Sequence, residues 1–312
     1  MSPVPVILNP TAGGGRLLRR RATLDAAAES VGTSLEWWST QGPGHAEELA
    51  FQAAKEDRPL VLAYGGDGTY NEVARGLLGS ATSMGALPGG TTSVLAYEFG
   101  VPRPAGRGLR ALLAGEDRAM RVGRSNADNV VLLMLSAGPD SHVLERLRPS
   151  LKRLGGRVGV VLQALIETAT GGPLPRLRVN FGQGAVEGGW AVVGKSRCYA
   201  GRFRATPGAD PFRDDFEVVV QKNVGRRASL SFLCSIPRGR HVHRSDVLRE
   251  LVSKVTLEPA VAASTVPYQV DGDVVGTLPV ELRIDPHPLW VRMPESTVIC
   301  RPVSLNPRPL TP

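Results

Sequence analysis

A glycine-rich segment with a single acidic residue, Gly65-Gly66-Asp67-Gly68-Thr69, directly follows the apolar run of residues 60–64. Glycines let backbone N–H groups approach a phosphate, and a helix that starts there directs its positive end at the same anion. The Asp67 carboxylate repels phosphate, so its expected role is to hold Mg²⁺ or to orient the reacting group. An Asp-Gly turn that only caps a helix is the simpler alternative.

Two further glycine-rich turns, residues 9–15 and 87–91, also follow short apolar runs. In a parallel sheet, all three turns emerge at one edge, where open α/β folds bind ligands. Neither GxxxxGK[ST] nor GxGxxG is present, so those two fingerprints do not apply. Arg16, just after the first turn, either reaches a phosphate or is an ordinary solvated arginine.

The elements that must position these turns alternate along the first part of the chain. We expect strands at 4–8, 35–38, 60–64 and 84–87, and helices at 16–30, 45–55 and 69–78 with a short one through 97. This alternation predicts a parallel sheet covered on both faces.

After about residue 123, short β-rich runs are separated by glycine and proline, which predicts a mostly β domain such as a sandwich. A helix is expected at 157–168, and a hairpin at Asp271-Gly272. We place the domains at 1–123 and 124–312, and allow for the last segment to return to the first domain.

Four motifs, in residues 7–13, 65–73, 87–91 and 270–273, resemble the diacylglycerol kinase catalytic domain family. That family includes sphingosine, ceramide and bacterial lipid kinases. The Gly-Gly-Asp-Gly-Thr core is shared with NAD kinases and phosphofructokinases, whereas Asn71-Glu72-Val73 is typical of the lipid kinases.

The resemblance implies a Rossmann-like α/β amino-terminal domain, a β-sandwich second domain and an active site in the cleft between them. It implies transfer of the γ-phosphoryl group of ATP, with Mg²⁺, to the hydroxyl of a diacylglycerol, sphingoid or related lipid in phospholipid biosynthesis. The nucleotide-binding residues that it implies are Asn9, Thr40, Gly65, Gly66, Asp67, Gly68, Thr69, Asn71, Glu72 and Thr91. From the residues alone, Thr40 is equally a helix-start threonine.

The catalytic residues implied are Asp273, as a general base for the acceptor hydroxyl, and Asp67. The family has Asp-Gly-Glu where this chain has Asp271-Gly272-Asp273, and from the residues alone Asp273 is more simply a hairpin-turn residue. The family also often has Asn-Asp where this chain has Ser93-Val94. An NAD-kinase-like enzyme with a soluble substrate and a catalytically weak nucleotide-binding protein are therefore the alternatives.

Two segments of the second part contain residues that could hold a metal ion. Residues 206–216 resemble a segment in which some bacterial family members bind a structural Mg²⁺, which points to Asp214 or Asp215. His241 and His243 would share one strand face as a possible metal pair, although two ligands do not close a zinc site, so a structural role is the simpler interpretation.

Charge is distributed unevenly along the 312 residues. Residues 1–123 contain 12 Lys+Arg and 12 Asp+Glu, and the remaining 25 and 17 place the whole net charge of +8 in residues 124–312. This asymmetry, and the basic residues 146–157 ahead of apolar residues 158–166, predict peripheral contact with an anionic membrane. Compositional drift explains the charge equally well, and a helix whose apolar face covers the sheet is the simpler interpretation of residues 158–166.

Other features narrow the class of protein. No run approaches the roughly 20 apolar residues of a membrane span, and no basic-then-apolar leader is visible. Cys198, Cys234 and Cys300 are far apart, so we expect a cytoplasmic protein without disulfides. No basic helix with interleaved aromatics suggests a nucleic-acid partner, and a homodimer is a further expectation.

Overall fold

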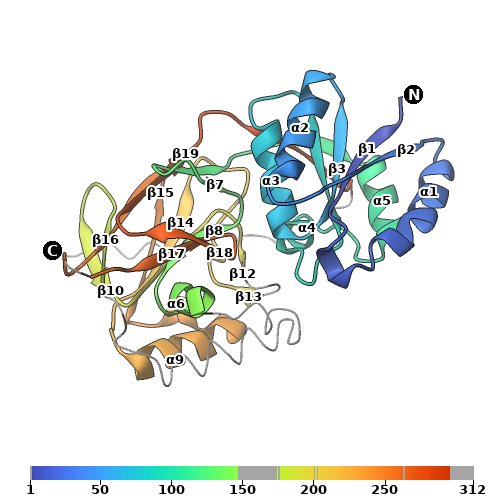
Figure 1. The fold of residues 1–312 in the computed structure, drawn as a ribbon. Helices are drawn as coiled ribbons and strands as arrows, with labels where there is room; N and C mark the ends of the chain where they lie inside the picture. Colours follow the sequence, from blue (N-terminus) through green and yellow to red (C-terminus); the bar gives the residue numbers. More distant parts are fainter. Residues whose placement is uncertain are drawn as a thin grey trace.

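The chain folds into two domains, shown from blue to cyan and from green to orange in Figure 1. The computed structural model describes residues 2–146, 174, 176–199, 201, 203–262 and 264–295. The helix predicted at 157–168 and nearly all of the basic segment 146–157 lie outside the described residues.

A six-stranded sheet forms the centre of the first domain, in the order β2-β1-β3-β4-β20-β5. Its strands are parallel except for β5, which runs antiparallel to β20. Every residue of β3 and β4 is buried, which explains their unbroken apolar sequences. The strands are β1 (Val4–Leu8), β2 (Leu35–Ser39), β3 (Leu60–Gly65), β4 (Ser83–Pro88), β5 (Glu116–Met120) and β20 (Leu289–Met293).

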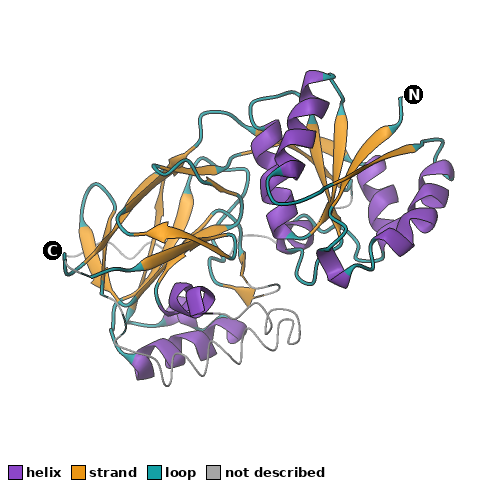
Figure 2. Ribbon diagram, viewed as in Figure 1, coloured by secondary structure: helices purple, strands orange, loops and turns teal. Residues whose placement is uncertain are grey.

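Helices cover both faces of this sheet (Figure 2), with α2 packed on α3 and α1 packed on α5. The predicted α/β architecture is thereby confirmed. The helices are α1 (Arg21–Glu29), α2 (His45–Lys55), α3 (Asp67–Leu77), α4 (Val94–Glu98) and α5 (Ala105–Leu113).

The helix predicted from residue 16 begins later than expected. Gly13, Gly14 and Gly15 all have positive φ, at 59°, 71° and 75°. They form the short turn η1 (Ala12–Gly14), and a second one, η2 (Leu18–Arg20), precedes α1. The glycines thus wind the chain tightly around the end of β1 before a regular helix can start.

The last described strand belongs to the first domain. β20 pairs with β4 on one side and β5 on the other, and buries Leu289, Val291 and Met293. The second domain is therefore inserted between two neighbouring strands of the first sheet.

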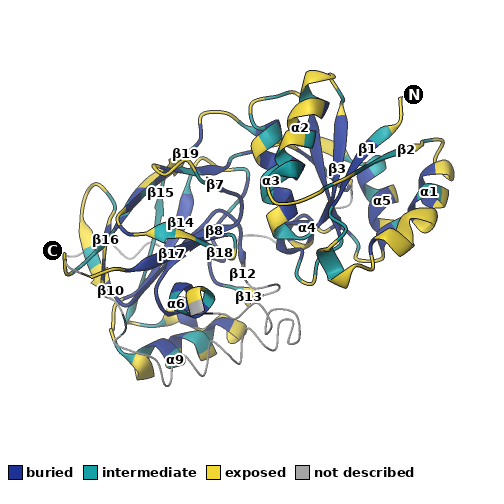
Figure 3. Cartoon of the chain, in the orientation of Figure 1, coloured by how far each residue is buried: buried dark blue, intermediate teal, exposed yellow. Residues whose placement is uncertain are grey.

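The second domain is a sandwich of two six-stranded sheets, as predicted. One has the order β10-β9-β16-β19-β6-β7 and the other β15-β14-β11-β8-β17-β18. Their facing sides share one apolar core, dark blue in Figure 3, and α9 covers the outer face of the second sheet through Trp190 and Phe232, whose rings lie 5.3 Å apart. The strands are β6 (Gly123–Ser125), β7 (Val130–Val131), β8 (Met134–Ala137), β9 (Leu177–Asn180), β10 (Ala185–Gly188), β11 (Trp190–Gly194), β14 (Phe216–Gln221), β15 (Val247–Val252), β16 (Lys254–Pro259), β17 (Pro267–Val270), β18 (Asp273–Thr277) and β19 (Val280–Ile284).

Smaller elements complete this domain, and two of them bear on the predictions. The hairpin at Asp271-Gly272 joins β17 to β18, with φ of 52° and 101° at the two turn residues. The expectation that His241 and His243 share a strand face is wrong, because they lie in the 3-10 turn η4. The elements are α6 (Pro139–Arg146), α9 (Arg226–Ser235), η3 (Ile236–Arg238), η4 (His241–His243), β12 (Cys198–Tyr199) and β13 (Phe203–Arg204).

Candidate active site

The three glycine-rich turns meet at the carboxyl edge of the first sheet and are hydrogen-bonded to one another. Asn9 Nδ2 donates to Thr69 Oγ1 over 3.2 Å. The N–H groups of Gly89 and Gly90 both donate to the Gly65 carbonyl, at 2.9 and 2.7 Å. A Cβ on Gly65 would lie 2.4 Å from Thr69 Oγ1, so only glycine fits there. The turns therefore form one structural unit.

Asp67 belongs to the turn after β3, and its carboxylate binds the segment that leads from the turn after β4 into α4. Oδ1 accepts the Leu95 N–H at 3.1 Å, and Oδ2 accepts the Thr92 hydroxyl at 3.0 Å. Burial raises the pKa of Asp67 above its usual value, although these hydrogen bonds oppose the effect. Each oxygen retains a lone pair, so the carboxylate can still accept a cation.

The first turn of α3 presents Gly68 to solvent, and the second domain approaches it there. Asp273, the first residue of β18, has its Oδ2 3.9 Å from the point that a Cβ on Gly68 would occupy. Residues that are two hundred positions apart are therefore brought together as the resemblance implies. A side chain at residue 68 would contact this carboxylate.

Asn71, one turn further along α3, makes a direct contact between the domains. Its Nδ2 donates to Asp271 Oδ2 and to the Val130 carbonyl, both at 2.8 Å. The Asp271 carboxylate also accepts three backbone N–H groups at 2.8 to 3.0 Å, from Leu132, Leu133 and Met134. We call this group of hydrogen bonds the Asp271 contact.

The two oxygens of the Asp271 carboxylate are occupied by these donors, while the residue as a whole is only partly buried. Burial raises the pKa of Asp271 to about 6 even though the backbone donors and Asn71 lower it. Four donors already occupy its two oxygens, which leaves Asp273 as the carboxylate of this motif that faces the glycine-rich loop.

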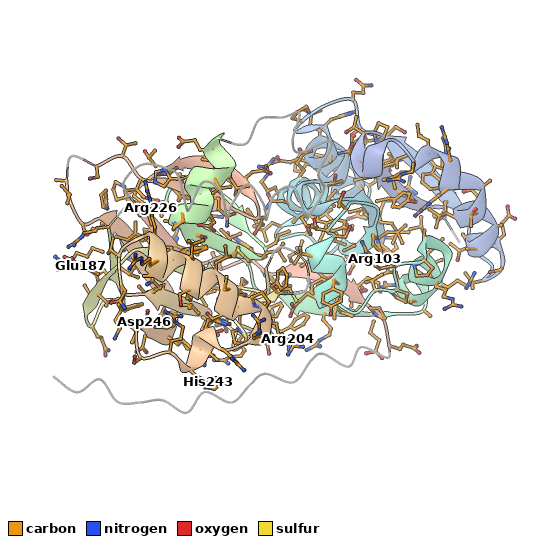
Figure 4. The ribbon with its side chains drawn as sticks, turned by 90° about the horizontal axis from the view of Figure 1, so that it is seen from below. Arg103, Glu187, Arg204, Arg226, His243 and Asp246 are labelled. Carbon is orange, nitrogen blue, oxygen red and sulfur yellow. The ribbon has the colours of Figure 1, made fainter. Side chains whose placement is uncertain are left out.

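A pocket of about 410 Å³ opens beside the loop after β4. Arg16, Arg20 and Arg103 line it together with the backbone of residues 88–91. Arg103 Nη2 donates to the Thr91 carbonyl at 3.1 Å; Figure 4 shows Arg103 in the first domain. A pocket with three arginines in its lining suits a polyphosphate. The lining comes from the first domain alone, and one lining residue, Gly90, lies against Gly66, two residues before Gly68.

Two residues predicted to bind nucleotide have other roles or positions. Glu72 Oε2 accepts the Ala46 N–H at 3.2 Å and so caps α2. Thr40 follows β2, two strands from β3, and its N–H donates to the Leu8 carbonyl at 2.9 Å. Thr91 does line the pocket. The assignment of these three residues to a nucleotide stays a prediction.

Asp214 and Asp215, the predicted ligands of a structural Mg²⁺, are paired with arginines. Asp214 Oδ1 lies 2.5 Å from Arg121 Nε, and Asp215 pairs with Arg213. The ammonium group of Lys195 occupies the space enclosed by this loop. Burial lowers the pKa of Lys195 to about 8 while the neighbouring Asp215 opposes the shift, so the ammonium form predominates at neutral pH. These residues do not fit a second cation.

The two histidines do not form a metal site either. His241 is buried, and its Nε2 lies 3.0 Å from the Ala205 carbonyl. Among the described residues, no three His, Cys, Asp or Glu side chains are grouped to hold a metal ion. No helix in the same part of the chain is long and apolar enough to span a bilayer.

Two family descriptions match this chain in succession. The diacylglycerol kinase catalytic domain matches residues 3–125, and the YegS C-terminal NAD kinase beta sandwich-like domain matches residues 134–293. The chain belongs to the diacylglycerol kinase family. This confirms the resemblance and makes the protein a member of a lipid kinase family.

Individual relatives are similar to this chain over nearly its whole length. A diacylglycerol kinase of Bacillus subtilis (strain 168) is 23% identical over 90% of this chain and 93% of its own. One from Mycobacterium tuberculosis (strain H37Rv) is 24% identical over 93% and 95%. The crystal structure of a diacylglycerol kinase from Bacillus anthracis str. Sterne superposes with a TM-score of 0.69 at 16% identity, covering 93% of this chain and 96% of its own. That likeness supports the fold.

Several residues that shape the site carry no direct signal in the sequence. The role of Asp271 depends on Asn71 and on backbone groups far from it in sequence. The same is true of Glu98, Lys195 and Arg197, whose partners are also distant along the chain. Lysine and arginine beside a strand end resemble ordinary surface residues until their burial is known.

Proposed function

We propose that the protein is an ATP- and Mg²⁺-dependent lipid kinase that phosphorylates the hydroxyl of a diacylglycerol, sphingoid or related lipid. The approach of Asp273 to Gly68 is the observation that supports this most directly. It puts a carboxylate of the second domain beside a helix start suited to phosphate, which is where an acceptor hydroxyl must be deprotonated.

In this proposal each part of the edge has one role. The first turn of α3 and the arginines of the pocket bind the phosphates of ATP, and Asp67 holds Mg²⁺. The metal ion, when bound, neutralises charge that develops on the phosphates. Asp273 takes the proton from the lipid hydroxyl as the hydroxyl oxygen bonds to the γ-phosphorus. The bond between the γ-phosphorus and the oxygen that bridges it to the β-phosphorus breaks, which releases ADP.

Transfer of radiolabelled phosphate from ATP to a panel of lipids in mixed micelles tests the proposal. Asp273→Asn should lower kcat by about 10²- to 10⁴-fold, the usual contribution of a general base. Asp273→Glu should retain more activity than Asp273→Asn, because the family has Glu there. Asp128→Asn is the control, since Asp128 is exposed and pairs with Arg124 away from the loops.

The alternatives give different results in the same assay. If no lipid is labelled but NAD⁺ is, the enzyme is NAD-kinase-like. If ATP binds and nothing is phosphorylated, the protein is a nucleotide-binding member without turnover, in keeping with Ser93-Val94 in place of Asn-Asp.

We further propose that the face of the second domain around α9 contacts an anionic membrane. Residues 222–244 contain six Lys and Arg and no Asp or Glu. Figure 4 views the molecule from this side, with Arg226 and His243 labelled beside α9. Near an anionic bilayer each such charge contributes about 1 kcal/mol. The exposed basic residues are Lys222, Arg226, Arg227, Arg238 and Arg240.

Vesicle sedimentation tests this contact. The protein should bind phosphatidylglycerol-containing vesicles more strongly than phosphatidylcholine vesicles, and Arg226→Glu with Arg227→Glu should abolish the difference. Arg178→Glu, an equally exposed position on β9, is the control. Equal binding of all three proteins to both kinds of vesicle would exclude α9 as the contact.

A further inference from the structure

The loop of residues 209–215 encloses a lysine side chain completely. Lys195 has no exposed surface, and its Nζ donates to three backbone carbonyls, of Asp210 at 2.7 Å, Arg213 at 2.6 Å and Asp215 at 3.2 Å. An ammonium group has three N–H donors, so each of them is used. Lys195 directly follows β11, and its own N–H and that of Ser196 are fixed on the Leu133 carbonyl at 2.8 and 3.0 Å.

Converging backbone carbonyls are the ligands that bind hard cations such as Ca²⁺ and Mg²⁺ in proteins. Here they already surround a positive charge that the chain itself supplies. Of the three acidic side chains of the loop, Asp214 is paired with Arg121 and Asp215 with Arg213, while Asp210 Oδ1 accepts the Phe212 N–H at 2.9 Å.

We infer that Lys195 is a built-in cation at the position where the resemblance implies a structural Mg²⁺, and that it holds the loop in the shape that joins the two domains. Unlike a metal ion, this cation cannot dissociate. The loop should therefore keep its structure in the absence of divalent metal.

The loop makes several contacts with the first domain. The ring of Phe212 stacks on Phe99 with 6.2 Å between centroids, and the Arg118 guanidinium lies 3.9 Å from the Phe212 ring centre. The Arg121 N–H donates to the Pro211 carbonyl at 2.9 Å, beside the ion pair of Arg121 with Asp214. A loop that lost its central cation would lose the geometry of these contacts.

A buried ion pair lies next to the same lysine. Arg197 Nε donates to Glu98 Oε1 at 2.7 Å, and Ser196 Oγ donates to Glu98 Oε2 at 2.9 Å. Glu98 ends α4, the helix that Asp67 caps. We call these interactions the Glu98 contact. Lys195 thus fixes the loop, and the two residues that follow it, Ser196 and Arg197, bind Glu98 of the first domain.

Thermal unfolding without nucleotide tests the inference on the wild-type protein. Its Tm should be the same in excess EDTA, in MgCl₂ and in CaCl₂. A Tm that rises with Mg²⁺ and falls with EDTA, and keeps doing so in Asp67→Asn, would show that a metal ion occupies the loop and would overturn the inference.

Lys195→Met keeps the aliphatic stem and removes the charge, so three buried carbonyls lose their donors. We expect its Tm to fall by about 5 °C or more, and Ca²⁺ or Mg²⁺ to recover part of that loss. Hydrogen exchange of peptides that span 206–216 should accelerate at least several-fold in this variant. Lys222→Met, an exposed lysine just after β14, is the matched control and should change neither measurement.

Unchanged Tm and unchanged exchange in Lys195→Met would also overturn the inference, because the ammonium group would then contribute nothing. If Lys195→Met does not fold, Lys195→Arg provides a second test. It retains the positive charge, but its guanidinium group is too large for the space that the loop encloses, so hydrogen exchange at 206–216 should accelerate locally. Unaltered exchange in that variant contradicts the assigned role.

Discussion

Two of the contacts between the domains are built differently. In the Asp271 contact, one carboxylate accepts four neutral N–H groups, from Asn71 and from the backbone of residues 132–134. In the Glu98 contact, the carboxylate is paired with a guanidinium, and both side chains are only 3% exposed. The first contact lies beside the glycine-rich loop and can change with protonation, whereas the second joins oppositely charged groups away from the loop. We therefore expect the stabilisation from the first contact to depend on pH, and the loss of the second contact to cost more.

Breaking the Glu98 contact should have the largest effect. Arg197→Met leaves the Glu98 carboxylate buried without its cation, which should lower the free energy of unfolding by about 3–5 kcal/mol. Urea denaturation measures this loss. The double variant Arg197→Met with Glu98→Leu should recover much of it, because no buried charge remains. A double variant no more stable than the single one would contradict the assignment.

Asp271→Asn should cost somewhat less, about 3 kcal/mol, because an amide cannot accept from four donors and its own NH₂ opposes two of them. Asp128→Asn serves as the control, since the Asp128 side chain is 84% exposed. A loss below about 1 kcal/mol in urea denaturation would show that water replaces the missing acceptor.

The pH dependence of that loss sharpens the difference between the contacts. The pKa of Asp271 is raised from 3.8 to about 6, so the folded protein binds this proton more tightly than the unfolded chain does. The stabilisation from Asp271 is therefore complete at pH below 3.8, the pKa in the unfolded chain, and is lost as pH rises through about 6, the pKa in the folded protein.

The penalty of Asp271→Asn should accordingly shrink by about 2 kcal/mol between pH 4 and pH 6.5. Urea denaturation of both proteins at several pH values measures the trend. A penalty that grows with pH would mean that the N–H donors outweigh burial and lower the pKa of Asp271.

Replacing Glu72 should have the smallest effect on stability. This residue serves as a reference for the two interdomain contacts because its hydrogen bond lies within the first domain. It neighbours Asn71 on α3 but caps α2 instead of contacting the second domain. Glu72→Ala should lower the free energy of unfolding by about 1 kcal/mol, as loss of a helix cap does. Hydrogen exchange at residues 130–134 should not change. Glu48→Ala, an exposed residue in the first turn of α2, is the control.

The sequence predicted the parts of this protein that depend on neighbours along the chain. Strands at 60–64 and 84–87, the glycine-rich turns after them and the Asp271-Gly272 hairpin all follow from local patterns of apolar and turn residues. The approach of Asp273 to Gly68 was expected only through the family resemblance.

What could not be predicted depends on groups that are distant in sequence. Asp271 finds its partners on α3 and before β8, and Lys195 finds its carbonyls only once loop 209–215 has closed. His241 was misplaced because an alternating His-Val-His pattern also fits a short 3-10 turn whose first residue is buried. Charge alone could not reveal which arginines are paired and which are exposed.

The position of β20 has a consequence for how the protein is made. The first sheet lacks a central strand until Leu289–Met293 has left the ribosome, long after β4 and β5 have been synthesised. Until then Met120 and the edge of β4 have no partner, and the emerging second domain must fold first. A fragment that ends at residue 123 would thus leave one edge of β4 unpaired and β5 without its partner strand, so we expect such a fragment not to fold as the isolated nucleotide-binding half.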